Sequence, residues 1–371
     1  MIRASILSIL VLTQQLVASS AELAKQAEGI LAGLKSDRAP GVAVLVLHDG
    51  EPIFERGYGV TDLRSLHAID AYTNFRLASV TKQFTAMAVM LLVHDGKLRY
   101  ENTLSDVFPN FPAYGKAIAI RNLLNHTSGL LDYEDLMAKP APGVAPDKVP
   151  QIQDAEVLQL LERQRTTKFP PGTKWEYSNS GYVLLGLVVQ KISGESFPDF
   201  LHQRIFEPLH MDNTIAYEAG KNEVAHRAYG HTRVGDHWEQ TDQSPTSATL
   251  GDGGVYSSLS DLRQWDRALR GHILLSEAEM RPALTPVQVP DGQPAEPEGA
   301  PAAYGFGWFL NPYKGHPRMW HYGETMGFHT AIERFTGDRL TVIVLCNRTD
   351  LDAMSLALQL ADAYFNGSTA P

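Results

Sequence analysis

Residues 42–58 read VAVLVLHDGEPIFERGY. Two strand-like runs, Val42 to Leu47 and Ile53 to Tyr58, flank the tripeptide His48-Asp49-Gly50. An Asp-Gly pair between two such runs is typical of a tight β-hairpin turn. We therefore expect an antiparallel hairpin near the start of the fold.

A similar pattern recurs near the other end of the chain. Runs from His329 to Phe335 and from Leu340 to Cys346 flank Thr336-Gly337-Asp338. Glu22 to Leu34 has helical spacing, and a last helix is expected to end before Gly367. Its apolar stripe consists of Ala353, Leu356, Ala357, Leu360, Ala361 and Tyr364. We expect one antiparallel sheet built from both chain ends and covered by these terminal helices.

The middle of the chain has a different character, because its periodicity is mostly helical from about Thr73 onward. The expected fold class is therefore α+β. Residues 22–72 and 302–371 are predicted to form the sheet domain, and residues 73–301 an inserted, mainly helical domain that carries Ser79 at the seam between the two.

Composition indicates the class of partner. The chain has 371 residues, 44% of them hydrophobic, and a formal net charge of −10. Without a long basic run, it offers no electrostatic reason to bind nucleic acid or an anionic membrane. We expect a small-molecule or peptide substrate. The composition does not indicate an oligomeric state.

The first 21 residues have the layout of a signal peptide. Arg3 precedes an apolar run from Ala4 to Leu12, and small residues follow up to Ala21. The run is too short to span a bilayer, so we expect cleavage and export to the periplasm or medium, without a stable membrane anchor. The alternative is an apolar first helix of the fold.

The single cysteine, Cys346, cannot close an intramolecular disulfide and is expected to be buried.

The segment LASVTKQF, residues 77–84, contains the chain's one Ser-x-x-Lys pattern. Ser79 and Lys82 are three residues apart and would share one face of a helix that opens here. A serine hydroxyl needs an adjacent base, and a lysine serves if burial and the positive helix end keep it neutral. About one Ser-x-x-Lys match is expected by chance in a chain of this composition. The prediction therefore depends on the position of Ser79 and Lys82 at the start of a helix.

A second element, KWEYSNSGY at 174–182, supplies a phenol and an amide. Tyr177 could relay a proton to the leaving group, and Asn179 could bind both Lys82 and the substrate carbonyl. This loop is expected to precede a helix beginning near Tyr182. The other Tyr-x-Asn triplets, which start at Tyr72, Tyr100 and Tyr364, lie too far from Ser79 or at a helix end.

A third element, WHYGE at 320–324, precedes the second hairpin. His321 would be a cationic or donor side chain on a strand that faces Ser79. Gly323 would allow a substrate backbone to approach closely.

With these three elements in this order, the chain resembles the penicillin-recognising serine enzymes: class C β-lactamases, DD-peptidases of the same fold, and related esterases and D-aminopeptidases. The resemblance covers about residues 42–347. It includes LLNHTSGL at 123–130, residues 169–186, GGVYSS at 253–258 and YGFGW at 304–308. It implies a β-lactamase/transpeptidase-like fold, an active site between the two domains, and no metal or organic cofactor.

The resemblance also assigns roles to individual residues. They are Ser79 as nucleophile, Lys82 and Tyr177 for proton transfer, Asn179 for substrate orientation, His321 where β-lactamases usually have lysine, and the backbone amides of Ser79 and Glu324 as the oxyanion hole. Tyr322 replaces the small hydroxyl residue that commonly holds the carboxylate of β-lactams. Glu324 adds negative charge at the same edge and disfavours anionic substrates unless Arg318 compensates.

We therefore expect a serine hydrolase that forms an acyl-enzyme from an amide or ester, as a peptidase or esterase. A true β-lactamase and a non-catalytic scaffold that keeps the fold are the alternatives. The chain lacks His-Glu-x-x-His spacing and a Gly-x-Ser-x-Gly elbow, which argues against a metallohydrolase and an α/β-hydrolase. Whether Lys82 or Tyr177 is the acylation base stays open from sequence.

Overall fold

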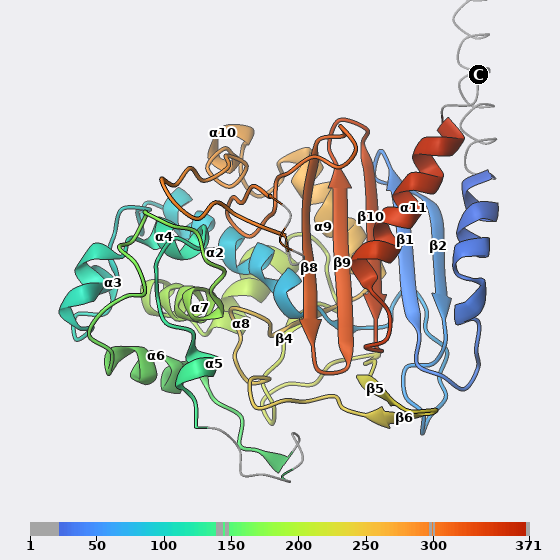
Figure 1. Cartoon of the computed structure of the whole chain (residues 1–371), viewed down its shortest axis with the longest axis horizontal. Coiled ribbons are helices and arrows are strands. Elements are labelled where there is room, and N and C mark those ends of the chain that lie inside the picture. Colours follow the sequence, from blue (N-terminus) through green and yellow to red (C-terminus); the bar gives the residue numbers. More distant parts are fainter. Residues whose placement is uncertain (1–21, 139–143, 145–147, 297–298, 300, 369–371) are drawn as a thin grey trace, which may run out of the picture.

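A five-stranded antiparallel sheet joins the two ends of the chain in the computed structural model, which describes residues 22–138, 144, 148–296, 299 and 301–368. Its strands are β1 Val42–His48, β2 Glu51–Tyr58, β8 Arg318–Thr325, β9 Phe328–Phe335 and β10 Leu340–Cys346. They lie in the order β2-β1-β10-β9-β8, and Val42 pairs with Cys346. The expected sheet from both chain ends is confirmed, and its two edge strands are β2 and β8 (Figure 1).

Both predicted hairpins are confirmed. Asp49 and Gly50 connect β1 to β2 with φ values of 56° and 80°. Two consecutive residues at positive φ suit a tight hairpin whose twist matches its strands, and Asp and Gly adopt this conformation at low cost.

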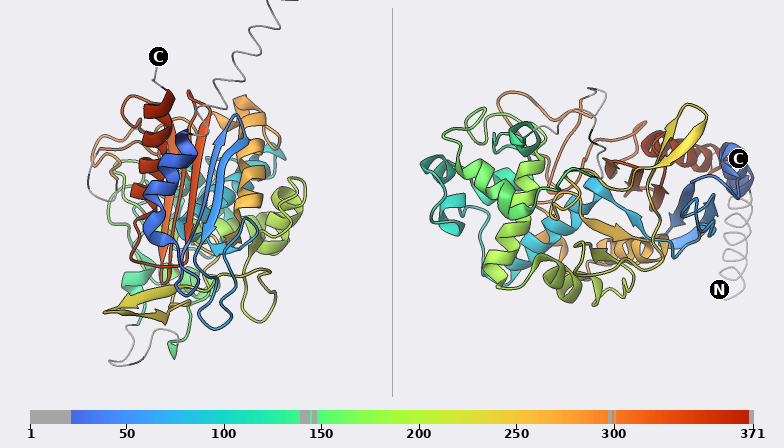
Figure 2. Two further views of the ribbon diagram at one scale, coloured as in Figure 1. Left: turned by 90° about the vertical axis from the view of Figure 1, so that its right-hand side faces the viewer. Right: turned by 90° about the horizontal axis from the view of Figure 1, so that it is seen from below.

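Both faces of the sheet are buried, because alternate side chains of each strand enter different cores. Val44 packs with α11 Ala353–Ser368 and with helical residues 22–30, whereas Leu45 belongs to the larger core on the other face. Helix α9 Leu259–Gly271 covers that second face, against β1 and β10. Figure 2 shows the sheet between these two layers.

The helical elements gather beside the β8 edge, as Figure 1 shows. They are α2 Lys82–His94, α3 Leu104–Val107, α4 Ile120–Leu124, α5 Tyr133–Leu136, α6 Asp154–Glu162, α7 Asn179–Ser193, α8 Phe197–Leu201 and α10 Glu277–Met280, with short 3-10 or π turns at Ala78–Thr81, Ala113–Ala117 and His202–Phe206. A further 3-10 turn, Ala32–Leu34, follows the N-terminal helix at the other end of the sheet. Helix α2 packs against α7, and eleven of its thirteen residues are buried. Burial on all sides makes α2 a rigid support for its own N-terminal end.

Two smaller sheets complete the fold. Strands β3 Phe75–Arg76, β7 Val255–Ser257 and β4 Ile215–Ala216 form one, in the order β3-β7-β4, and β5 His231–Val234 pairs with β6 His237–Gln240. The expected helical segment 73–301 thus also contains short strands, and its helix α9 lies on the main sheet. The exact division at residues 73 and 301 stays a prediction.

The N-terminal expectation is not tested by the fold, since residues 1–21, the expected signal peptide, lie outside the described residues. In the part of the chain that is described, no helix is both long and apolar enough to span a bilayer. Cys346 is buried in β10, as expected.

Candidate active site

The segment before Ser79 is anchored to two sheets. Phe75 of β3 pairs with Ser257 of β7. The amide of Leu77 donates to the Val255 carbonyl at 2.9 Å, and its carbonyl accepts from Thr330 Oγ1, on β9, at 2.8 Å. These bonds fix the backbone just before Ser79 between the main sheet and the helical region.

Ser79 lies in a 3-10 turn, and α2 begins only at Lys82. The helix expected to open within residues 77–84 thus does so, but its first turn is 3-10 and only the part from Lys82 onward is α-helical. The chain bends sharply at Ala78, a buried non-glycine residue with a φ of 47°, before it tightens into the helix. Such strained backbone costs free energy and persists only where the surroundings enforce it. Ser79 itself stays partly exposed, so its hydroxyl is accessible.

The Lys82 amine contacts three oxygen atoms although its side chain is completely buried. The distances from Nζ are 3.0 Å to Oγ of Ser79, 2.8 Å to Oδ1 of Asn179 and 2.9 Å to the carbonyl oxygen of Asp252. A neutral amine has two hydrogens and one lone pair. The amide and carbonyl oxygens can only accept, so they use the hydrogens and leave the lone pair for the Ser79 hydroxyl.

Burial favours this neutral form. It lowers the pKa of Lys82 to about 8, even though the charges of Asp252, Asp132 and Glu134 oppose the shift. At neutral pH a useful fraction of the lysine is therefore uncharged, which is the state a proton acceptor needs.

Tyr177 and Asn179 reach the same place from the start of α7. This helix begins at Asn179, three residues earlier than expected, because the Ser178 side chain caps it by accepting from the Gly181 amide. Interaction with the Ser79 side chain lowers the pKa of the Tyr177 phenol, but burial has the larger effect and raises it. Its ring centroid is 4.9 Å from Nζ of Lys82. A phenol with a raised pKa is a proton donor rather than a ready base.

The edge strand β8 passes directly beside Ser79. A Cβ at Gly323 would lie 2.2 Å from the Leu77 carbonyl oxygen and 3.0 Å from the Ser79 amide nitrogen. Only glycine permits this approach.

His321 is near the site, and of the two roles expected for it, cation or hydrogen-bond donor, the structure disfavours the cationic one. Burial lowers its pKa to about 3, and the charge of Lys82 adds to the shift. Its Nδ1 donates to the Tyr322 carbonyl at 2.6 Å, and its Nε2 accepts from the Tyr304 hydroxyl at 3.2 Å. Both ring nitrogens are thus used within the protein, and the ring packs 6.3 Å from that of Tyr177.

Tyr322 and Glu324 lie on the other side of the pleat from Gly323. The Tyr322 ring is half-buried and stacks on those of Phe309 and Trp320. Glu324 is exposed. Arg318 does not compensate it, because this buried guanidinium binds Glu296 at 2.9 Å and Glu333 at 3.4 Å.

Three contributors to the site escaped the sequence interpretation. Asp252 contacts Lys82 through its main-chain carbonyl, which leaves no signal in the sequence, and its carboxylate also raises the pKa of the lysine. Glu134, at the start of α5, accepts from Nδ2 of Asn179 at 3.3 Å. In the sequence its one signal is its acidic side chain shortly after the Ser128-Gly129 pair. His126 lay in the quoted LLNHTSGL segment but was interpreted as structural.

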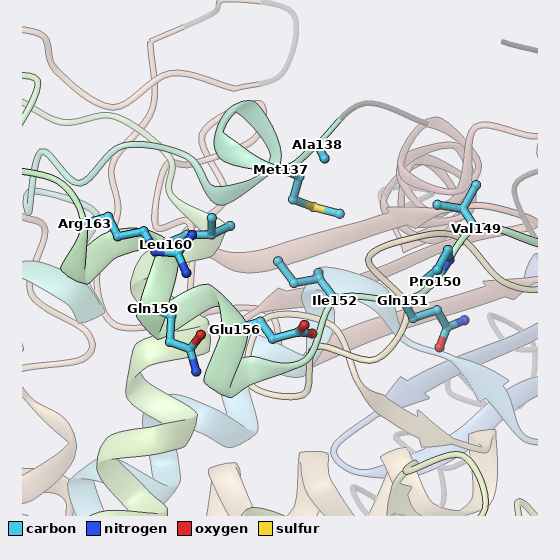
Figure 3. Close-up of a pocket in the computed structure, with 10 residues that line it drawn as sticks. All are labelled: Met137, Ala138, Val149, Pro150, Gln151, Ile152, Glu156, Gln159, Leu160 and Arg163. Carbon is cyan, nitrogen blue, oxygen red and sulfur yellow. The ribbon is translucent and has the colours of Figure 1, made fainter. Parts of the chain in front are cut away.

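A separate groove lies between α5 and α6, with a volume of about 430 Å³. It is lined by Met137, Ala138, Val149, Pro150, Gln151, Ile152, Glu156, Gln159, Leu160 and Arg163, as Figure 3 shows. None of the residues around Ser79 contributes to it, so its size does not bear on the chemistry. Within the described ranges, no group of three or more His, Cys, Asp or Glu residues is arranged to hold a metal ion.

The sequence matches the Beta-lactamase family over residues 21–365. Penicillin-binding protein 4* of Bacillus subtilis (strain 168) is 33% identical over 320 residues, which cover 83% of this chain and 68% of the relative. D-aminopeptidase of Gluconobacter oxydans (strain 621H) is 29% identical over 335 residues, covering 87% of this chain and 59% of that protein. The structure of D-amino acid amidase from Ochrobactrum anthropi SV3 complexed with L-phenylalanine amide superposes with a TM-score of 0.75 at 25% identity, covering 93% of this chain and 98% of the amidase.

Proposed function

Because the chain belongs to the Beta-lactamase family, we propose that Ser79 attacks an amide or ester carbonyl, forms an acyl-enzyme and releases the acyl group to water. The chain is a β-lactamase-related serine hydrolase, and the assignment of its catalytic residues is our proposal. The observation that best supports this assignment is the 3.0 Å contact between Nζ of the buried Lys82 and Oγ of Ser79.

Lys82 is the better acylation base of the two candidates. Its pKa of about 8 is close to neutral pH, whereas that of Tyr177 is raised above its already high ordinary value. In the proposed reaction Lys82 takes the hydroxyl proton while Oγ of Ser79 bonds to the carbonyl carbon. The negative oxygen of the tetrahedral intermediate accepts from the backbone amides of Ser79 and Glu324.

Collapse of that intermediate breaks the bond to the leaving group. The proton held by Lys82 passes through the Tyr177 hydroxyl to the departing nitrogen or oxygen, so both side chains return to their starting states. Water then attacks the acyl carbonyl, and the same groups act in reverse to restore Ser79. Asn179 orients the substrate carbonyl and keeps the Lys82 amine in place.

Charge favours a neutral or cationic substrate over an anionic one. Asp132, Glu134 and Asp252 interact electrostatically with Lys82, and the exposed Glu324 stands at the β8 edge. This negative field would repel anionic penicillins, whereas it would attract the ammonium group of amino-acid amides and esters. Similarity to proteins named D-aminopeptidase and D-amino acid amidase supports an amidase or peptidase rather than a β-lactamase.

Replacing Ser79 with Ala tests the proposal. Hydrolysis of p-nitrophenyl acetate and of D-alanine p-nitroanilide should fall by a factor of about 10³ or more. A fluorophosphonate should add its mass to the wild-type protein at Ser79 and leave the variant unmodified. Ser65→Ala, at an exposed serine, is the matched control and should stay active. Undiminished hydrolysis in Ser79→Ala would refute the assignment, and an inert Ser79 would favour the scaffold alternative.

We also propose export, on the basis of the charged, apolar and small-residue pattern of residues 1–21. N-terminal sequencing of the protein recovered from a bacterial periplasm should give a mature start near Glu22. An unprocessed N-terminus would contradict it.

A further inference from the structure

His126 occupies an unusual position behind Tyr177. It follows α4, is completely buried, and has a φ of 60°. A bulky residue with left-handed backbone is uncommon, because its Cβ crowds the following carbonyl. The fold therefore accepts a cost at this position.

The same residue holds the chain on both sides of Tyr177. Its carbonyl accepts from the Glu176 amide at 3.0 Å, and its Nδ1 accepts from the Ser178 amide at 3.1 Å. Its imidazole also packs against the Tyr177 ring, with centroids 4.4 Å apart and planes at 35°. The backbone before the phenol, the backbone after it and the ring itself thus all contact His126.

These contacts fix the charge of the imidazole. A backbone amide only donates, so Nδ1 must be unprotonated and the proton lies on Nε2, which makes no hydrogen bond to any described residue. Burial, with Lys82 and His321 nearby, lowers the pKa of His126 well below its ordinary value. The ring stays neutral at the pH at which Lys82 becomes a base.

We infer that His126 is a positioning residue that holds the Tyr177 phenol against Ser79 through the acceptor nitrogen Nδ1. This inference rests on the proposed role of Tyr177 in proton transfer. It differs from a general packing role, because it predicts that the effect of His126 on catalysis depends on the presence of the phenol.

A double-mutant cycle tests it, with kcat and KM measured on p-nitrophenyl acetate. His126→Phe keeps a ring beside Tyr177 but removes the acceptor. We expect kcat to fall about 10- to 100-fold, as small misplacements of catalytic groups do, with KM within about threefold. In a Tyr177→Phe background the same substitution should cost less than about threefold further, because coupled residues are not additive.

His126→Asn is the conservative variant. Its Oδ1 can accept from the Ser178 amide, and asparagine tolerates left-handed backbone. It should recover most of the kcat that His126→Phe loses. If His126→Phe does not fold, as judged by its thermal midpoint, His126→Ala takes its place in the cycle.

Three results would overturn the inference: equal losses of kcat with and without the Tyr177 hydroxyl, no recovery in a folded His126→Asn, or full activity in Tyr177→Phe alone. Failure of the proposed function is distinguished separately by Ser79→Ala. If Ser79→Ala loses activity while His126→Phe lowers kcat equally with and without the Tyr177 hydroxyl, the proposed hydrolase function is supported. Only the positioning role of His126 is then refuted.

Discussion

Nζ of Lys82 lies 2.9 Å from the main-chain carbonyl oxygen of Asp252. Asp252 therefore acts on the lysine in two ways that can be separated by mutation. Its carbonyl helps to orient the amine whatever side chain stands at this position. Its carboxylate is the first of the charges that raise the pKa of Lys82 against the larger effect of burial.

The rate should depend on pH through Lys82. Because its pKa is about 8, the neutral amine increases as pH rises. The ratio kcat/KM should therefore rise about tenfold per unit at low pH and level off above pH 8. Stopped assays with an amide substrate from pH 5.5 to 9.5 would measure this. Lys82→Arg should be inactive throughout, because a guanidinium stays protonated, and a flat wild-type profile would exclude Lys82 as the base.

Asp252→Asn should shift that profile to lower pH. Asparagine keeps the carbonyl contact and an acceptor for the Tyr133 hydroxyl, which bonds Oδ2 of Asp252 at 3.1 Å, but removes the negative charge. The apparent pKa should fall by about 0.5 to 1 unit. Asp236→Asn, at an exposed aspartate remote from Lys82, is the control and should leave the profile unchanged. An upward shift in Asp252→Asn would contradict this account of the electrostatics.

Asn179→Asp should act in the opposite direction. Its side chain is nearly the same shape, and an oxygen at the Oδ1 position would still accept from Lys82 at about the present 2.8 Å. A carboxylate there stabilises the ammonium form, so the apparent pKa should rise by about 1 unit or more. It also loses the Nδ2 donor to Glu134 and places two carboxylates side by side. The pH profile of kcat/KM, measured beside that of Asp252→Asn, would show whether the two shifts have opposite signs.

The sequence predicted what depends on local pattern. The hairpins at Asp49-Gly50 and before Leu340 follow from turn chemistry and alternation, and the three-residue spacing of Ser79 and Lys82 from helical geometry. The strained turn at Ala78 was missed because alanine carries no signal for positive φ; the small sheet and the Leu77 hydrogen bonds enforce it. The sequence could not decide whether His321 is a cation or a neutral donor, because the burial that lowers its pKa depends on tertiary packing.

Gly323→Ala should damage the site more than the fold. The added Cβ would lie 2.2 Å from the Leu77 carbonyl oxygen, 2.6 Å from Thr330 Oγ1 and 3.0 Å from the Ser79 amide nitrogen. Two of these neighbours are backbone atoms, so β8 must move away from the turn that carries Ser79. Such overpacking costs about 1–3 kcal/mol of unfolding free energy. A shift of about 1 Å between catalytic groups costs about 100-fold in rate.

Gly29→Ala is the matched control for this substitution. Gly29 lies in helical residues 22–30, and an added Cβ there meets nothing within 4 Å. Alanine should raise the unfolding free energy by about 0.5–1 kcal/mol and leave kcat/KM unchanged, since it favours helix over glycine. Urea unfolding and ester hydrolysis would be measured on both variants. Wild-type kcat/KM in Gly323→Ala would show that β8 can move without disturbing Ser79. The proposal that the Glu324 amide, on the same strand, binds the oxyanion would then be contradicted.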